Sequence, residues 1–192
     1  NGNKMSKSLE NTVDPQEVCK KFGADILRLW VASTEYTADV RIGEQILNQN
    51  AEAYRKIRNT FRFLLGNLSD YNNDTDRVPY EKMGEVDQYM ECSLNQFLEN
   101  AYKAFDAYAF DEVYRSALTY MTNQLSSYYL DYTKDILYIE KANSHARRSI
   151  QTVIYHTTKA LATLLTPLIP YTTEEVYKYF VGNNSIFRKR NI

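Results

Sequence analysis

Residues 44–68 read EQILNQNAEAYRKIRNTFRFLLGNL, and this stretch repeats apolar side chains with the period of an α-helix. Its apolar face comprises Ile46, Tyr54, Ile57, Phe61, Leu64, Leu65 and Leu68. A helix with one apolar stripe must bury that stripe against other elements. The stretch therefore predicts a long helix on the surface of a helical core, and the rest of the chain has to supply its partners.

The same stretch places arginines on a second face. Arg55, Arg58 and Arg62 follow a spacing of three and then four residues, which aligns side chains on a helix. Guanidinium groups pair with phosphates, so this face is a candidate contact for RNA. The alternative is a solvated face with ion pairs inside the helix, for example between Glu52 and either Arg55 or Lys56. The spacing supports the two interpretations equally.

Helical patterns continue toward the C-terminus. A polar segment over residues 69–80 carries turn-forming residues and separates the first long helix from the next. The predicted helical stretches then cover Gly84 to Phe105, Asp111 toward Leu130, Ile136 to Ile139, and Ser144 to the residues before Pro167. Thr172 and Glu175 have the spacing of a capping box, which predicts a short last helix that ends near Gly182.

Before residue 44 two shorter helices are expected. Asp14 can cap a helix whose first turn contains Pro15 and Glu17, and Gly23 is a typical stop. A second helix is predicted directly after it, over residues 24–32. These signals predict a helical pair ahead of the long helix.

Together the patterns predict an all-α protein. Only residues 37–42 show a weak two-residue alternation, enough for one short extended segment. We expect an antiparallel helical bundle over residues 44–192 and a loop with a small helical appendage over residues 1–43. Because the chain starts with Asn1 rather than Met, we expect it to be a piece of a longer protein.

The net charge of −1 hides an uneven distribution of charged residues. Residues 1–70 carry 10 Lys and Arg against 9 Asp and Glu, residues 71–143 carry 6 against 13, and residues 144–192 carry 7 against 2. The chain is therefore not a uniformly basic nucleic-acid binder, although local basic faces remain open to RNA.

Metal and membrane motifs are missing from the sequence. Cys19 and Cys92 lie far apart without a CxxC pair, so we expect neither a disulfide framework nor a metal site, and we interpret the isolated His145 and His156 as structural. No apolar run approaches the ~20 residues that span a bilayer, and no signal peptide is visible. We expect a cytoplasmic protein.

The first residues form a polar loop with concentrated chemistry. Lys4 and Lys7 alternate with Ser6 and Ser8, which offers two ammonium groups and two hydroxyls within five positions. Such groups suit a polyphosphate whose negative charge is being redistributed. The alternative is a chance Lys- and Ser-rich loop.

The string KMSKS at residues 4–8 resembles the signature loop of class I aminoacyl-tRNA synthetases. Residues 23–30 (GADILRLW) are similar to the segment that follows this loop in the isoleucyl-tRNA synthetases, and residues 54–65 (YRKIRNTFRFLL) to the first long helix of that family's anticodon-binding bundle. Further similar strings lie at residues 128–131, 146–152 and 172–176. The resemblance thus covers nearly the whole chain and points to isoleucyl-tRNA synthetases of the bacterial type.

The resemblance implies a catalytic role for two residues of the loop. Lys7 would stabilise the pyrophosphate leaving group while the aminoacyl adenylate forms, and Lys4 would assist it. The same loop, comprising Lys4, Met5, Ser6, Lys7 and Ser8, would bind ATP, with the serines holding its shape. One departure concerns this loop, because the family usually has glycine where Glu10 stands, and a carboxylate there removes backbone freedom.

The resemblance also implies that the bundle binds tRNA. The candidate contacts are Arg55, Arg58, Arg62, Arg147 and Arg148. Arg147 and Arg148 lie near a predicted helix start, where the helix dipole disfavours cations. Their expected partner is therefore either the acidic middle segment of the chain or RNA, and we slightly favour the acidic segment.

The resemblance further implies that ATP, Mg²⁺ and isoleucine act at a catalytic domain outside this chain, and that zinc belongs to a C-terminal region that is also outside it. We expect this fragment to be inactive alone and monomeric, without binding to DNA or membranes. The alternatives are a fragment of a valyl- or leucyl-tRNA synthetase, a stand-alone RNA-binding helical module, and a helical scaffold that binds no tRNA.

Overall fold

The computed structural model of the chain describes residues 4–181, apart from the side chains of Lys7 and Val181. Within these residues the regular structure is entirely helical, which confirms the predicted all-α class. In chain order the elements are η1 (Lys7–Leu9), α1 (Pro15–Phe22), α2 (Ala24–Ser33), α3 (Glu44–Gly66), α4 (Asn73–Asp76), η2 (Tyr80–Lys82), α5 (Glu85–Asp106), α6 (Phe110–Thr119), η3 (Tyr120–Leu130), α7 (Asp131–Ile139), α8 (His145–Leu165) and α9 (Pro170–Val181).

The two short N-terminal helices form as the sequence predicts. Asp14 caps α1 by accepting a hydrogen bond from the Gln16 amide at 2.8 Å, and Pro15 is the first helical residue. Gly23 ends α1 with φ of 95°, a conformation that glycine adopts without steric cost. The turn at Gly23 leads directly into α2, which packs against α3, α6 and α9.

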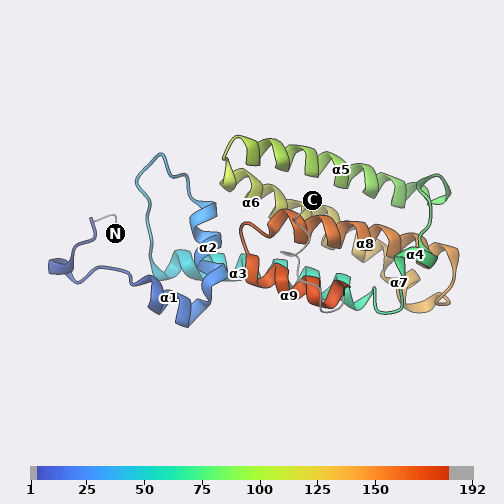
Figure 1. Cartoon of the computed structure of the whole chain (residues 1–192), viewed down its shortest axis with the longest axis horizontal. Coiled ribbons are helices and arrows are strands. Elements are labelled where there is room, and N and C mark those ends of the chain that lie inside the picture. The colour runs from blue at the N-terminus through green and yellow to red at the C-terminus, as the bar shows by residue number, and fades with distance from the viewer. Residues whose placement is uncertain (1–3, 182–192) are drawn as a thin grey trace.

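The remaining long helices form the bundle, as Figure 1 shows. Helices α5 and α6 run side by side, α8 packs against α5 and α9, and α3 packs against α8 and α9. The loop with η1 projects from one end of the molecule, whereas α4 and α7 lie at the opposite end (Figure 1).

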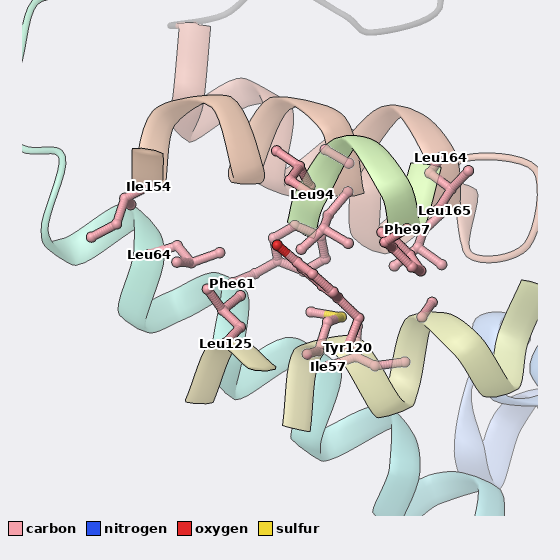
Figure 2. Packing of buried hydrophobic residues seen from close by; sticks show 14 of the residues in the cluster. Ile57, Phe61, Leu64, Leu94, Phe97, Tyr120, Leu125, Ile154, Leu164 and Leu165 are labelled. Atoms are coloured by element: carbon pink, nitrogen blue, oxygen red, sulfur yellow. The ribbon is translucent and has the colours of Figure 1, made fainter. Parts of the chain in front are cut away.

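One continuous apolar core joins the helices. Figure 2 shows Phe61 and Leu64 of α3 facing Leu125 of η3 and residues of α5 and α8. Leu29 and Ala32 of α2 belong to the same core, so α2 packs as part of the bundle. The division of the chain after residue 43 stays a prediction. Within residues 4–181, no helix has both the length and the apolar character needed to cross a membrane.

The segment Tyr120–Leu130 is a π-helix, which the sequence analysis did not foresee. It lies between α6 and α7 without a break in the helical run. The buried residues of this segment are Tyr120, Met121, Leu125, Tyr129 and Leu130, so core positions recur about every four to five residues, which fits the wider turn of a π-helix. π-helical segments are rare and occur frequently at functional sites.

The predicted capping box at Thr172 is wrong. Helix α9 already begins at Pro170, so Thr172 lies inside its first turn and is buried. Proline suits this start because the first amide of a helix needs no partner within the helix. The cap comes instead from Asp25, far away in the sequence. The predicted end of the helix near Gly182 lies outside the described residues.

Candidate nucleic-acid interface

The signature loop is a single 3-10 turn closed by local hydrogen bonds. The amide of Leu9 donates to the Ser6 carbonyl at 3.2 Å, and the Ser6 and Ser8 hydroxyls lie 3.0 Å apart. Asn11 holds the turn from behind, because its side chain accepts from the Ser6 amide at 2.8 Å and donates to the Lys4 carbonyl at 3.2 Å. The serines thus shape the loop, while Lys4 is exposed and has no ion pair among residues 4–181.

Glu10 adopts a left-handed backbone conformation with φ of 49°. This conformation costs a non-glycine residue roughly 1 kcal/mol or more, whereas glycine adopts it freely. The strain gives a physical reason for the glycine expected at this position from the resemblance. Glu10 therefore makes the turn of the signature loop less stable than glycine would.

We expect the Glu10→Gly variant to close this turn more firmly. Removing roughly 1 kcal/mol of strain, partly offset by the greater freedom of glycine in the open loop, should slow hydrogen exchange of the Leu9 amide about two- to fivefold. Glu10→Ala is the matched control, because it removes the charge and keeps the strain. Equal slowing in both variants would assign the effect to the charge instead.

Helix α2 joins the loop segment to the bundle through two polar side chains. Asp25 is buried and accepts hydrogen bonds from the Thr172 amide at 2.7 Å and the Thr172 hydroxyl at 2.5 Å. One turn later, Arg28 donates to the carbonyl oxygens of Pro167 at 2.6 Å and Leu168 at 3.1 Å. The carboxylate thus caps the start of α9, and the guanidinium satisfies carbonyls beyond the end of α8.

The cationic face of α3 is exposed as the spacing predicts. Arg55 forms an ion pair with Glu52 one turn earlier, which is the intrahelical pairing considered from the sequence. Arg58 and Arg62 are exposed, as is Lys56, and within the described part of the chain none of the three has an ion pair. Helix α3 therefore exposes three cations without an ion pair, of which Arg58 and Arg62 share one face.

Arg147 and Arg148 have internal partners. Arg147 makes a bidentate contact with the Asp70 carboxylate, at 2.6 and 3.1 Å, and Arg148 lies 3.5 Å from Asp76 and 3.6 Å from Asp70. Their side chains are only 14% and 16% exposed. The side chain of Gln151 also donates a hydrogen bond to Asp70, at 2.8 Å. The carboxylates of Asp70 and Asp76 offset the unfavourable position of the two arginines at the start of α8.

The Asp70 contacts predict a specific loss of stability in acid. The Arg147 hydrogen bonds lower the pKa of Asp70 from 3.8 to about 2. The stability linked to this shift is therefore fully present above pH 3.8 and is lost as the pH falls toward 2. Because the side chain is 38% exposed, solvent screens the pair, and we expect a loss of about 1 kcal/mol.

This loss can be measured by denaturant unfolding at a series of pH values. The Asp70→Asn variant cannot titrate at this position, so its stability deficit relative to the parent chain should shrink between pH 4 and 2. A deficit that stays constant across this window would show that Asp70 keeps an ordinary pKa.

A buried polar cluster inside the bundle escaped the sequence analysis. Asp87, in the first turn of α5, accepts hydrogen bonds from the Tyr129 hydroxyl at 2.6 Å and the Ser149 hydroxyl at 2.5 Å. Burial, and secondarily the Asp87 charge, raises the pKa of Tyr129 well above its usual value, so this phenol stays a donor. Asp87 occupied an ordinary polar position in the sequence pattern, and no local signal marks it.

His156 contacts a carboxylate of α5. Its Nδ1 lies 2.7 Å from Oε1 of Glu91, in a partly buried pair between α8 and α5. Among residues 4–181, no group of three or more His, Cys, Asp and Glu side chains is arranged to hold a metal ion.

Two family models match the chain. The model described as the anticodon-binding domain of tRNA ligase matches residues 87–191, and the model of class I tRNA synthetases (I, L, M and V) matches residues 1–43. The matches thus cover the bundle from α5 onward, and the signature loop with α1 and α2.

Curated relatives are similar along almost the whole chain. An isoleucine–tRNA ligase of Geobacillus kaustophilus is 54% identical over 178 residues, which is 93% of this chain and 19% of the relative. The ligases of Listeria monocytogenes and Lactobacillus helveticus are each 50% identical, over 96% and 100% of this chain and 20% and 21% of the relatives. The chain therefore spans about a fifth of the length of these relatives.

Solved structures share the fold at low sequence identity. The LeuRS–tRNA–LeuAMS complex of Agrobacterium radiobacter K84 matches with a TM-score of 0.71 and 19% identity, over 96% of this chain and 22% of that one. The free methionyl-tRNA synthetase of Mycobacterium tuberculosis matches with a TM-score of 0.65 and 16% identity, over 86% of this chain and 34% of that one.

Proposed function

The chain belongs to the family of anticodon-binding domains of tRNA ligases, and on this basis we propose that it is the signature loop and anticodon-side bundle of an isoleucine–tRNA ligase. The observation that carries the choice of amino acid is the identity of 50% or more to isoleucine–tRNA ligases over nearly the full chain. The whole enzyme would attach isoleucine to its tRNA at the expense of ATP.

The loop would supply cations to the ATP phosphates. Lys7 would follow the charge that develops on the leaving pyrophosphate, and Lys4 would assist, since an ammonium group that binds the transition state more tightly than the ground state speeds the reaction. The exposed Lys4 fits this role because no carboxylate competes for it within the described residues. Met5, Ser6 and Ser8 would contribute the shape of the turn.

The bundle would hold the tRNA through its phosphates. Arg58 and Arg62 are free for this on α3, whereas Arg55 would have to exchange Glu52 for a phosphate. Arg147 and Arg148 are engaged with Asp70 and contribute most directly by fixing the start of α8. An RNA contact from these two would need the Asp70 ion pair to open.

Metal ions would act elsewhere in the enzyme. We assign Mg²⁺ to the ATP phosphates at the catalytic domain, and zinc to the C-terminal region of the longer protein. The enzyme would work in the cytoplasm as a monomer, with tRNA as its macromolecular partner.

The proposal can be tested by fluorescence anisotropy of this chain with isoleucine tRNA, with the same tRNA carrying a swapped anticodon, and across a salt titration. We expect binding that weakens steeply with salt, because phosphate contacts release counterions. A preference for the native anticodon would show that the bundle reads it. Equal binding of both tRNAs would leave only a phosphate-contacting surface, and no binding at low salt would favour the scaffold alternative.

A further inference from the structure

The signature loop is held in shape by a few contacts of its own. It projects from one end of the molecule, away from the bundle (Figure 1). Within residues 4–181, and leaving aside the side chain of Lys7, the hydrogen bonds of residues 4–9 join them to one another or to Asn11. The positions of the two lysines in this loop therefore depend on a small set of local bonds.

One side chain bridges the two parts of the loop that carry the lysines. The Oδ1 of Asn11 accepts a hydrogen bond from the Ser6 amide at 2.8 Å, and its Nδ2 donates one to the Lys4 carbonyl at 3.2 Å. The reverse orientation of the carboxamide would set donor against donor and acceptor against acceptor, so only this orientation satisfies both contacts. Because the carboxamide is planar and the side chain is half-buried, Asn11 acts as a clamp between the backbone at Lys4 and the backbone at Ser6.

Ser6 passes this constraint on to Lys7. The Ser6 carbonyl, which shares a peptide bond with Lys7, accepts a hydrogen bond from the Leu9 amide at 3.2 Å. Both backbone polar groups of Ser6 are thus engaged, the amide with Asn11 and the carbonyl in the 3-10 turn whose first residue is Lys7. The backbone of Lys7 therefore starts from a point that Asn11 helps to fix.

The strained residue beside Asn11 adds to the importance of the clamp. Glu10 reverses the chain with a φ of 49°, and this reversal brings Asn11 against Ser6 and Lys4. A left-handed conformation is unfavourable for a residue with a Cβ, so the strain at Glu10 favours opening of the turn. The two hydrogen bonds of Asn11 oppose that opening.

We propose that Asn11 is a positioning residue for adenylate formation, one that places the backbone of Lys4 and Lys7 so that their ammonium groups meet the leaving pyrophosphate. The inference rests on the proposed function and adds a residue to it. In that reaction a carboxylate oxygen of isoleucine bonds to the α-phosphorus of ATP. The bond from this phosphorus to the pyrophosphate oxygen breaks, and its electron pair stays on the pyrophosphate. Cations that are held in advance where this charge develops lower the barrier, because they need no reordering during the reaction.

ATP–pyrophosphate exchange by the longer enzyme that contains this chain tests the role of Asn11. Asn11→Ala removes both hydrogen bonds and should lower kcat about tenfold or more, while KM for ATP stays within about threefold, because misplaced lysines lose contacts made in the transition state. Thr12→Ala is the matched control, at an exposed neighbour whose side chain has no hydrogen bond among the described residues. It should leave kcat within about twofold of the parent value.

A double-mutant cycle shows whether Asn11 acts through the lysines. In a Lys7→Ala background, Asn11→Ala should lower kcat by less than about threefold, because a group that Asn11 positions is already missing. The transfer of isoleucine from preformed adenylate to tRNA should stay within about twofold in Asn11→Ala, since the pyrophosphate has left before this step. A general loss of folding would slow adenylate formation and transfer alike.

The outcomes separate this inference from the proposed function. An unchanged kcat in Asn11→Ala, or a rise in KM alone, would overturn the positioning role and leave the proposed function standing. The same loss of kcat with and without Lys7, or an equal slowing of the transfer step, would also overturn it and leave Asn11 as a residue that only stabilises the loop. Absence of isoleucine-dependent exchange in the parent enzyme would contradict the proposed function itself.

Discussion

Replacing Asp25 by Ala is expected to lower the free energy of unfolding by about 3 kcal/mol. In the variant both the amide and the hydroxyl of the buried Thr172 lose their charged acceptor, and a hydrogen bond to a charged group contributes about 1.5–3 kcal/mol. Urea unfolding followed by circular dichroism measures the change. Hydrogen exchange should also become faster at the amides of Tyr171 and Thr172.

The effect is large because Asp25 serves two helices. It lies in the first turn of α2, and its carboxylate also faces the first turn of α9. Both N-termini carry partial positive charge, which explains how a buried carboxylate is held without an ion pair among the described residues. The side chain ties the segment that carries the signature loop to the last helix of the bundle.

Two controls separate this tertiary cap from ordinary capping. Asp25→Asn keeps one acceptor and should lose roughly half as much stability as the alanine variant. Asp14→Ala removes an exposed local cap of α1 and should cost only about 1 kcal/mol. Equal losses for Asp14→Ala and Asp25→Ala would contradict the special role of Asp25.

Replacing Asp87 by Ala is expected to cost a similar amount, about 3 kcal/mol. The substitution removes the shared acceptor of Tyr129 and Ser149, whose side chains are 0% and 1% exposed. A buried hydroxyl without a partner costs about 1–3 kcal/mol, and water cannot replace the carboxylate in a closely packed core. Thermal and urea unfolding should both report the loss.

A double-mutant cycle isolates the Asp87–Tyr129 contact. Tyr129→Phe alone should cost about 1 kcal/mol, since Asp87 keeps its bond to Ser149. The double variant should lose less stability than the two single variants together. In Asp87→Ala both the Tyr129 and the Ser149 hydroxyl lack a partner, whereas in the double variant only the Ser149 hydroxyl does. Strict additivity would show that the two side chains stabilise the bundle independently.

Much of the fold was predictable because its causes are local. The cap at Asp14, the stop at Gly23 and the stripe of α3 depend on neighbours within one or two turns, and the structure contains them. The candidate site was predictable in part. The signature string and the arginine spacing are readable in the sequence, but whether each arginine is free or paired is not.

The failures share one physical origin. Thr172 had the pattern of a capping box, yet a carboxylate about 150 positions away provides the cap, and the start of α9 shifts to Pro170 accordingly. The π-helix likewise was not foreseen from the sequence pattern, and its buried residues Tyr120, Met121, Leu125, Tyr129 and Leu130 all belong to the core that the other helices share. Long-range contacts of this kind override local propensity.

The sequence alone determined the helical class, the boundaries of the long helices, the family and the signature loop. These depend on periodicity and on short strings of residues, and both are properties of the chain before it folds. Tertiary structure alone decided that Asp70 would occupy Arg147 and Arg148 while Arg58 and Arg62 stay free, and that Asp25 would bind Thr172. Such features form only when the chain folds, because each consists of side chains that are far apart in the sequence. The packing of the shared core brings these side chains together.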